Sequence, residues 1–167
     1  ASNVVVGYNA GNDLTTGGQN TILGFDSGDT LTTGISNVLV GYAAGGNLHS
    51  DSSQNVIIGE SAGGGIVQLD GMVIIGRLAG YAINSSDVDN TVLIGNQAGR
   101  YLTSGQESVL IGYQAGYTLT TGDANTALGF AALYHNVTGN YNTAIGRGAG
   151  ARFLKAESTA LGYYAGH

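Results

Sequence analysis

The sequence predicts an all-β protein, a parallel β-solenoid or β-roll of ten coils with about 17 residues each. Three observations support this fold class. A short aliphatic run ending in glycine occurs ten times in the 167 residues, at spacings of 17, 17, 18, 17, 19, 17, 17, 17 and 16 residues. The runs are too short for stable helices. They are rich in β-branched residues, which favour strands. The closing glycines of these runs are Gly7, Gly24, Gly41, Gly59, Gly76, Gly95, Gly112, Gly129, Gly146 and Gly162.

Each aliphatic run predicts a short strand that stops at its closing glycine. Three residues before that glycine, every copy has Val or Thr. The residue directly before it is always aliphatic: Val6, Leu23, Val40, Ile58, Ile75, Ile94, Ile111, Leu128, Ile145 and Leu161. The residue between these two positions is aliphatic in seven copies and Ala in the last three; the seven are Val5, Ile22, Leu39, Ile57, Ile74, Leu93 and Leu110. We expect both sets to form the core of the roll or of its trimer.

After each closing glycine, the sequence predicts a tight corner, a second short strand and a turn. The fourth residue after the closing glycine is Gly in nine copies and Leu133 in the other, and we expect a positive φ there. Seven residues after the closing glycine, the sequence has a column of large apolar residues that is interrupted by Asn136. We expect Leu133 to fill the space that a large apolar residue would occupy at Asn136. Turn residues such as Thr15-Thr16-Gly17 close the coil. The apolar column contains Leu14, Leu31, Leu48, Ile66, Ile83, Leu102, Leu119 and Phe153.

The predicted strands are apolar on both faces, which predicts a homotrimer. Side chains alternate between the two faces of a strand, so neighbouring residues such as Val5 and Val6 point in opposite directions. One face can be buried inside the thin coil. The other would form an aliphatic stripe longer than soluble monomers usually expose. Three identical chains that pack around, or intertwine about, a common axis would cover it.

The phrases "SVLIGYQAG", "NTALGFAAL", "NTAIGRGAG" and "STALGYYAG" resemble the head-domain repeats of trimeric autotransporter adhesins, the YadA-like left-handed parallel β-roll. Similar repeats occur in trimeric fibres of phages and of bacterial surfaces. The resemblance covers essentially the whole chain, although these coils are longer than those of the family and the early copies are richer in Val and Ile. It implies a homotrimer at a cell surface or in a virion fibre, an adhesive or spacer role, and a surface glycan or protein as receptor.

Composition restricts the partners further. The formal net charge is −6 and the few Lys and Arg residues are scattered, which argues against nucleic acid as a partner. No apolar run is long enough to insert into a membrane. We expect residues 1–167 to form a single repeat domain and, because the sequence begins and ends inside a repeat, to be a fragment of a longer fibrous protein.

The residue after the closing glycine is aromatic in six copies, and two interpretations are open. The rings could form an exposed row on which sugar rings stack. Alternatively, they could pack against one another between adjacent coils. The six residues are Tyr8, Phe25, Tyr42, Tyr113, Phe130 and Tyr163.

Asparagine stands at the start of six predicted strands, where we expect hydrogen bonds from coil to coil, with an ion site at the trimer axis as the alternative. The aspartates lie mostly in turns, where they favour solubility. The three histidines, His49, His135 and His167, lack metal-ligand spacing, so we expect no metal and no cofactor. The asparagines are Asn3, Asn20, Asn37, Asn55, Asn125 and Asn142.

Two alternative functions and one irregular segment remain. Residues 48–89 contain the longest coils, whose loops could serve recognition or be neutral insertions. A left-handed β-helix acyltransferase needs three hexapeptides in each coil, and here one fits. An ice-binding solenoid needs regular outward Thr, but the Thr pairs lie in turns and are interrupted at His49-Ser50 and Val67-Gln68. We therefore expect a non-enzymatic fibre segment.

Overall fold

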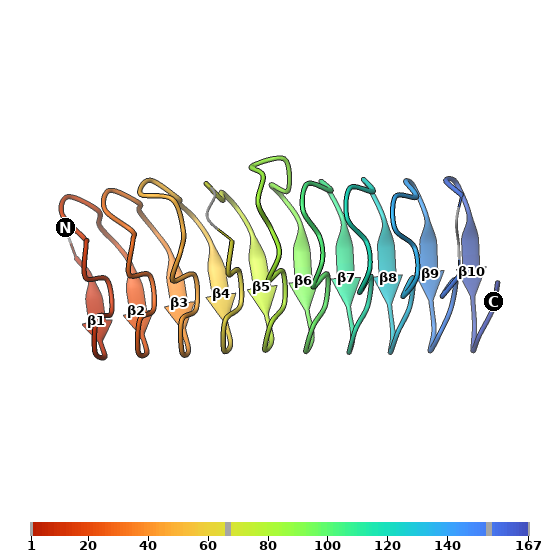
Figure 1. The fold of residues 1–167 in the computed structure, drawn as a ribbon, viewed down its shortest axis with the longest axis horizontal. Coiled ribbons are helices and arrows are strands. Elements are labelled where there is room, and N and C mark those ends of the chain that lie inside the picture. Colours follow the sequence, from red (N-terminus) through yellow and green to blue (C-terminus); the bar gives the residue numbers. More distant parts are fainter. Residues whose placement is uncertain (1, 66–67, 153–154, 167) are drawn as a thin grey trace.

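The computed structural model describes residues 2–65, 68–152 and 155–166, and it confirms the predicted all-β solenoid. Ten parallel strands form one sheet in chain order, β1 to β10. In Figure 1 the strands stand side by side and point the same way, with turns at both ends of every coil. The strands are β1 (Val4–Val6), β2 (Thr21–Leu23), β3 (Val38–Val40), β4 (Val56–Ile58), β5 (Val73–Ile75), β6 (Val92–Ile94), β7 (Val109–Ile111), β8 (Thr126–Leu128), β9 (Thr143–Ile145) and β10 (Thr159–Leu161).

The register of the strands follows the repeat without a slip. Val38 pairs with Val56, Leu39 with Ile57 and Val40 with Ile58, and the other strand pairs are aligned in the same way. Chemically equivalent residues therefore lie above one another along the whole stack. This alignment turns each column of the sequence into a continuous row on the solenoid.

The structure separates the two apolar faces of the strands. The middle residue of each strand points into the coil; Ile22, Leu39 and Ile57 are completely buried. The flanking residues point outward and are partly or fully exposed. The interior is completed by leucines from the far side of the coil, such as Leu31, and by the small residues of the corner. Val5 is the exception in its column, because β1 is an edge strand and Val5 remains 40% exposed.

The far side of the coil, which we call the return leg, differs from the prediction of a second strand. Among the described residues, each coil has one three-residue strand, and the rest of the coil consists of turns and irregular backbone, apart from one isolated parallel bridge between Ser53 and Asp70. The residues two and four positions after the closing glycine have positive φ, for example 49° at Ala43 and 55° at Gly45. Such left-handed residues interrupt the extended geometry of a strand. Backbone hydrogen bonds still join adjacent return legs, as from Gly28 N to Ala44 O at 3.1 Å.

The corner behaves as predicted at Leu133. This residue adopts a φ of 52°, like the glycines in the same column, and its side chain is completely buried. Asn136 is buried beside it. The predicted core positions Ile66 and Phe153, and also His167 and Val67, lie outside the described residues.

The longer coils keep their own apolar anchors. Met72, at the start of β5, and Leu69 are completely buried. Val88 is also buried and holds the loop between β5 and β6, which protrudes from the stack in Figure 1. The extra residues therefore extend a loop and leave the strand register unchanged.

Candidate functional site

The outward residues of the strands form a continuous apolar row on the surface, which we call the outer strip. It consists of the residues one and three positions before each closing glycine. From β3 to β7 all ten of these residues are Val or Ile, and all are partly exposed. Exposure rises toward the edge strands, to 56% at Val6 and 73% at Leu161. The predicted core residues that directly precede the closing glycines therefore lie on the outside of the single chain.

The six aromatic residues that follow the closing glycines are all exposed, and five of them stack between adjacent coils in two groups, while Tyr163 contacts the edge of its neighbour Tyr164. Phe25 stacks between Tyr8 and Tyr42, with ring centroids 5.2 and 5.5 Å apart. Tyr113 stacks on Phe130 at 5.1 Å, and the Arg147 guanidinium lies 4.9 Å from the Phe130 ring. These are the contacts that the packing interpretation requires. Tyr8 and Tyr42 thus cover both faces of the Phe25 ring. Stacking of sugar rings on this row stays a prediction.

A second aromatic cluster lies on the return legs after β5 to β8, and we call it the tyrosine–arginine row. Tyr117 stacks on Tyr134 at 5.0 Å and meets the edge of Tyr101 at 5.1 Å. The guanidinium of Arg100 lies near the rings of Tyr81 and Tyr101. Sequence reasoning missed this cluster, although a signal was present: Tyr stands five residues after Gly76, Gly112 and Gly129. The row consists of Tyr81, Arg100, Tyr101, Tyr117, Tyr134 and His135.

The asparagine column lies inside the coil and bonds as the local interpretation expects. Asn37 is completely buried, and its Nδ2 donates to Asn20 Oδ1 at 3.1 Å and to Ser52 O at 2.8 Å. Its Oδ1 accepts from both nitrogens of Asn55. Asn125 and Asn142 repeat the pattern. The asparagine side chains of this column therefore face the coil interior, on the opposite side of the backbone from the outer strip.

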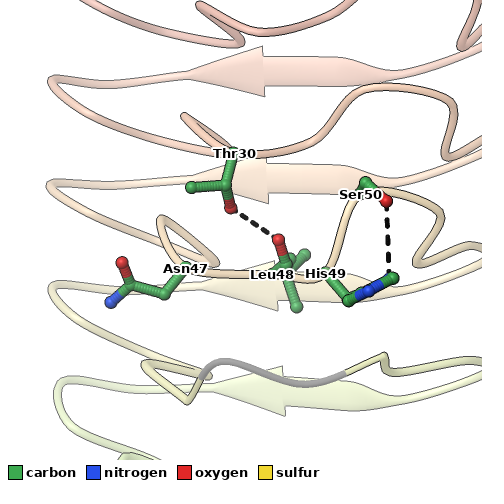
Figure 2. A pocket seen from close by; sticks show the side chains of 5 residues that line it. All are labelled: Thr30, Asn47, Leu48, His49 and Ser50. Carbon is green, nitrogen blue, oxygen red and sulfur yellow. Dashed lines mark hydrogen bonds between the residues drawn. The ribbon is translucent and has the colours of Figure 1, made fainter.

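One small pocket lies on the return legs after β2 and β3 (Figure 2). It has a volume of about 230 Å³ and is lined by Thr30, Asn47, Leu48, His49 and Ser50. Pockets for small ligands usually measure roughly 300–1,000 Å³. The Thr30 hydroxyl already donates to Leu48 O. The pocket is therefore small for a substrate.

Histidine, serine and aspartate meet at this pocket, but not in a catalytic arrangement. Asp51 Oδ1 and Ser50 Oγ both contact Nδ1 of His49. In a catalytic triad the carboxylate and the hydroxyl bond to different ring nitrogens. The hydrogen bond with His49 at the exposed surface lowers the pKa of Asp51.

The remaining titratable groups offer no metal site in the described part of the chain. No three His, Asp or Glu side chains there converge as metal ligands. Burial, together with the carboxylates of Asp13 and Asp26, raises the pKa of Asp29. Burial also raises the pKa of Asp89 in the long loop, whose carboxylate accepts from Asp70 N. Across the described ranges, no helix has the length and apolar character that would let it cross a membrane.

Comparisons with known proteins identify no relative: no family model, no curated protein and no solved structure matches this chain.

Proposed function

We propose that this chain is a non-enzymatic, rod-forming segment of an extracellular fibre, that it assembles as a homotrimer through the outer strip, and that it supports attachment to cells. The observation that carries the proposal is the outer strip itself. Ten Val and Ile side chains on five consecutive strands face outward, partly exposed, in an unbroken row. A stripe of this kind favours association with a complementary apolar surface.

Identical chains supply such a surface because the strip is repetitive. Each coil presents Val or Thr at the first strand position and Val, Leu or Ile at the third, and the strand register aligns these positions from coil to coil. Three parallel copies in register would bring equivalent rows together around one axis and remove them from water. The resemblance to YadA-like head repeats supports the same arrangement.

A trimeric rod suits attachment for a physical reason. Three copies of every surface feature are displayed together, so weak single contacts add up to firm multivalent binding. The stacked backbone hydrogen bonds keep these features at fixed distances along the rod. The small pocket beside His49 and the single-nitrogen contact of Asp51 and Ser50 supply no comparable support for an enzyme.

The assembly is tested by light scattering coupled to size-exclusion chromatography. We expect the wild-type mass to equal three chains of 16.8 kDa. Ile75→Glu places a charge in the middle of the outer strip and is expected to give a folded monomer. Ile35→Glu is the matched control, because Ile35 is 46% exposed but lies outside the strip; it should stay trimeric. A wild-type monomer at micromolar concentration, or identical behaviour of the two variants, contradicts the proposal.

The attachment role is tested with fluorescently labelled wild-type protein on animal cells and on bacterial cells. Binding to animal cells supports an adhesin. Binding to bacteria supports the receptor-binding segment of a phage tail fibre. A trimer that binds neither panel contradicts the attachment role and leaves a passive spacer.

A further inference from the structure

The tyrosine–arginine row occupies a different side of the coil from the outer strip. Its residues stand five or six positions after a closing glycine, on the return leg. The coil interior lies between the return leg and the strand, because inward leucines such as Leu102 and Leu119 join the same core as Leu93 and Leu110. Side chains that leave the return leg outward therefore point away from the outer strip. The row stays available when the strip is covered.

The row spans four coils: ring contacts join Tyr101, Tyr117, Tyr134 and His135, and the Arg100 guanidinium lies near the rings of both Tyr81 and Tyr101. Tyr117 and Tyr134 lie parallel within 10°, while Tyr101 meets Tyr117 at 86°. His135 closes the row at one end, 4.6 Å from the Tyr134 ring. Tyr81 and Tyr101 are 46% and 43% exposed. With a coil spacing of about 4.8 Å, the row is about 15 Å long.

Arg100 gives this surface a local positive charge, in a chain whose formal net charge is −6. Its Cζ lies 5.8 Å from the Tyr81 ring centroid and 5.6 Å from that of Tyr101. Among the described residues, no carboxylate lies within ion-pairing distance of its guanidinium. The four return-leg segments 79–84, 98–103, 115–120 and 132–137 contain no Asp or Glu, although the chain carries 11 acidic residues. An anionic group on a ligand would complete this site.

The chemistry of the row fits a saccharide better than a second copy of the chain. Of the large aliphatic residues in the four return-leg segments, Ile83, Leu102, Leu119 and Leu133 are buried inside the coil, and Val137 is exposed at 45%. The surface is thus built from phenol rings bordered by hydroxyls such as that of Thr118, without the Val and Ile side chains of the outer strip. Tyrosine rings offer flat faces to the C–H groups of sugars and hydroxyls to their oxygens. The coil spacing of about 4.8 Å also resembles the length of one sugar unit in an extended chain.

We propose that the tyrosine–arginine row binds an acidic polysaccharide that lies along the rod, with a carboxylate or sulfate of the ligand on Arg100 and sugar rings on the exposed tyrosines. This inference deepens the proposed function, since it names a ligand class and a surface for attachment by the rod. The two ideas can fail separately, because the row requires neither a trimer nor the outer strip.

The experiment measures binding of the intact chain to three defined probes by isothermal titration calorimetry at low salt. The probes are hyaluronan oligosaccharides (carboxylates), heparin oligosaccharides (sulfates) and dextran oligosaccharides (uncharged). We expect at least one acidic probe to bind and dextran to show no measurable binding. The acidic probe that binds more tightly identifies the preferred anionic group. A folded protein that binds neither acidic probe, or that binds dextran equally well, overturns the proposal.

Matched variants locate the site. Arg100→Gln and Tyr101→Ala should each weaken binding at least about tenfold, the loss expected for a charge-assisted hydrogen bond or a stacking ring. Arg147→Gln and Tyr113→Ala are the controls, because they carry the same chemistry in the other aromatic row. The controls should stay within about twofold of wild type. Equal losses in both rows would overturn the assignment.

The mass of each variant separates this proposal from the assembly. Arg100→Gln and Tyr101→Ala should keep the wild-type mass and the wild-type circular dichroism spectrum while they lose binding. If Tyr101→Ala instead lowers the assembly mass, the row is an interface between copies and the saccharide proposal is wrong. If wild type is a monomer that binds the acidic probe through Arg100, the trimer fails and the saccharide site stands.

Discussion

The closing glycines Gly59 and Gly76 approach each other across adjacent coils so closely that Gly59 has no room for a side chain. A β-carbon on Gly59 would lie 2.7 Å from both the carbonyl carbon and the carbonyl oxygen of Gly76. Gly59 also has a φ of 132°, a conformation that residues with a β-carbon rarely adopt. The constancy of this column in the sequence therefore has a structural cause, the close approach of successive backbones.

Gly59→Ala is expected to lower the free energy of unfolding by at least about 2 kcal/mol, since backbone strain and overpacking add together. Urea denaturation followed by circular dichroism measures the loss. The control is Gly71→Gln, because a β-carbon at Gly71 meets only Asn90 Oδ1 at 3.5 Å and Gln19 stands at the same place in its own coil with a φ of 60°. A control as damaging as Gly59→Ala would refute the close-approach explanation.

Asn37→Ala removes one step of the buried amide column. The backbone N–H of Asn55 would lose its acceptor, Asn37 Oδ1 at 3.1 Å. A buried polar group that is left without a hydrogen-bond partner costs about 1–3 kcal/mol. We expect a decrease of that size in the free energy of unfolding. Asn37→Thr should recover part of it, because Thr91 Oγ1 accepts from Ser108 N in the same column. Asn47→Ala, which removes an exposed amide bonded to Gly64 O, should change little.

Leu133 and Asn136 should behave as an exchanged pair. In a regular coil, a β-carbon on the corner glycine Gly45 would lie 2.9 Å from Leu48 Cδ1, so the corner side chain and the leucine compete for one space. Leu133→Gly alone opens a cavity and should cost about 2–5 kcal/mol. Asn136→Leu alone crowds Leu133 and removes the acceptor of Gly139 N.

The double variant Leu133→Gly/Asn136→Leu restores the pattern of the other coils. It should therefore be clearly more stable than the sum of the two single changes predicts, as measured by a double-mutant cycle in urea. Strict additivity would show that the two side chains do not share the space.

The stability of the first coils should depend on pH through Asp29. Its folded pKa is raised, first by burial and then by Asp13 and Asp26. The folded state therefore binds the proton more tightly than the unfolded chain, and this contribution to stability is lost as pH rises through the folded pKa. Asp29→Asn should raise the melting temperature at pH 7, and the difference from wild type should shrink as pH falls toward the ordinary aspartate pKa.

Asp51→Asn supplies a control of opposite sign. Hydrogen bonding to His49 lowers the pKa of Asp51, so its contribution exists above the unfolded pKa and disappears as pH falls through the folded value. Asp51→Asn should therefore lower the melting temperature at pH 7 and have little effect in strong acid. A shift of the same sign in both variants would contradict the assigned causes.

Much of this structure could be predicted from the columns of the sequence. The recurrence of an aliphatic residue before each closing glycine predicted the strands, and the strand bounds end at that residue in every coil. The replacement of the corner glycine by Leu133 beside Asn136 predicted an exchange of packing, and both side chains are buried. These inferences succeeded because each depends on residues of one coil and their equivalents in the next.

The sequence by itself therefore determined the solenoid, its register and its ten strands, since a repeat with near-constant spacing aligns backbone and side chains alike. The tertiary structure decided which apolar face is internal. Alternation along Val38, Leu39 and Val40 shows two faces but does not say which one the chain curls toward. The chain turns there through left-handed residues after the strand, and the one that lies two positions after the closing glycine, such as Ala43, is not a glycine in nine of the ten coils. The same turns replaced the expected second strand and brought Tyr81, Arg100 and Tyr117 into one row.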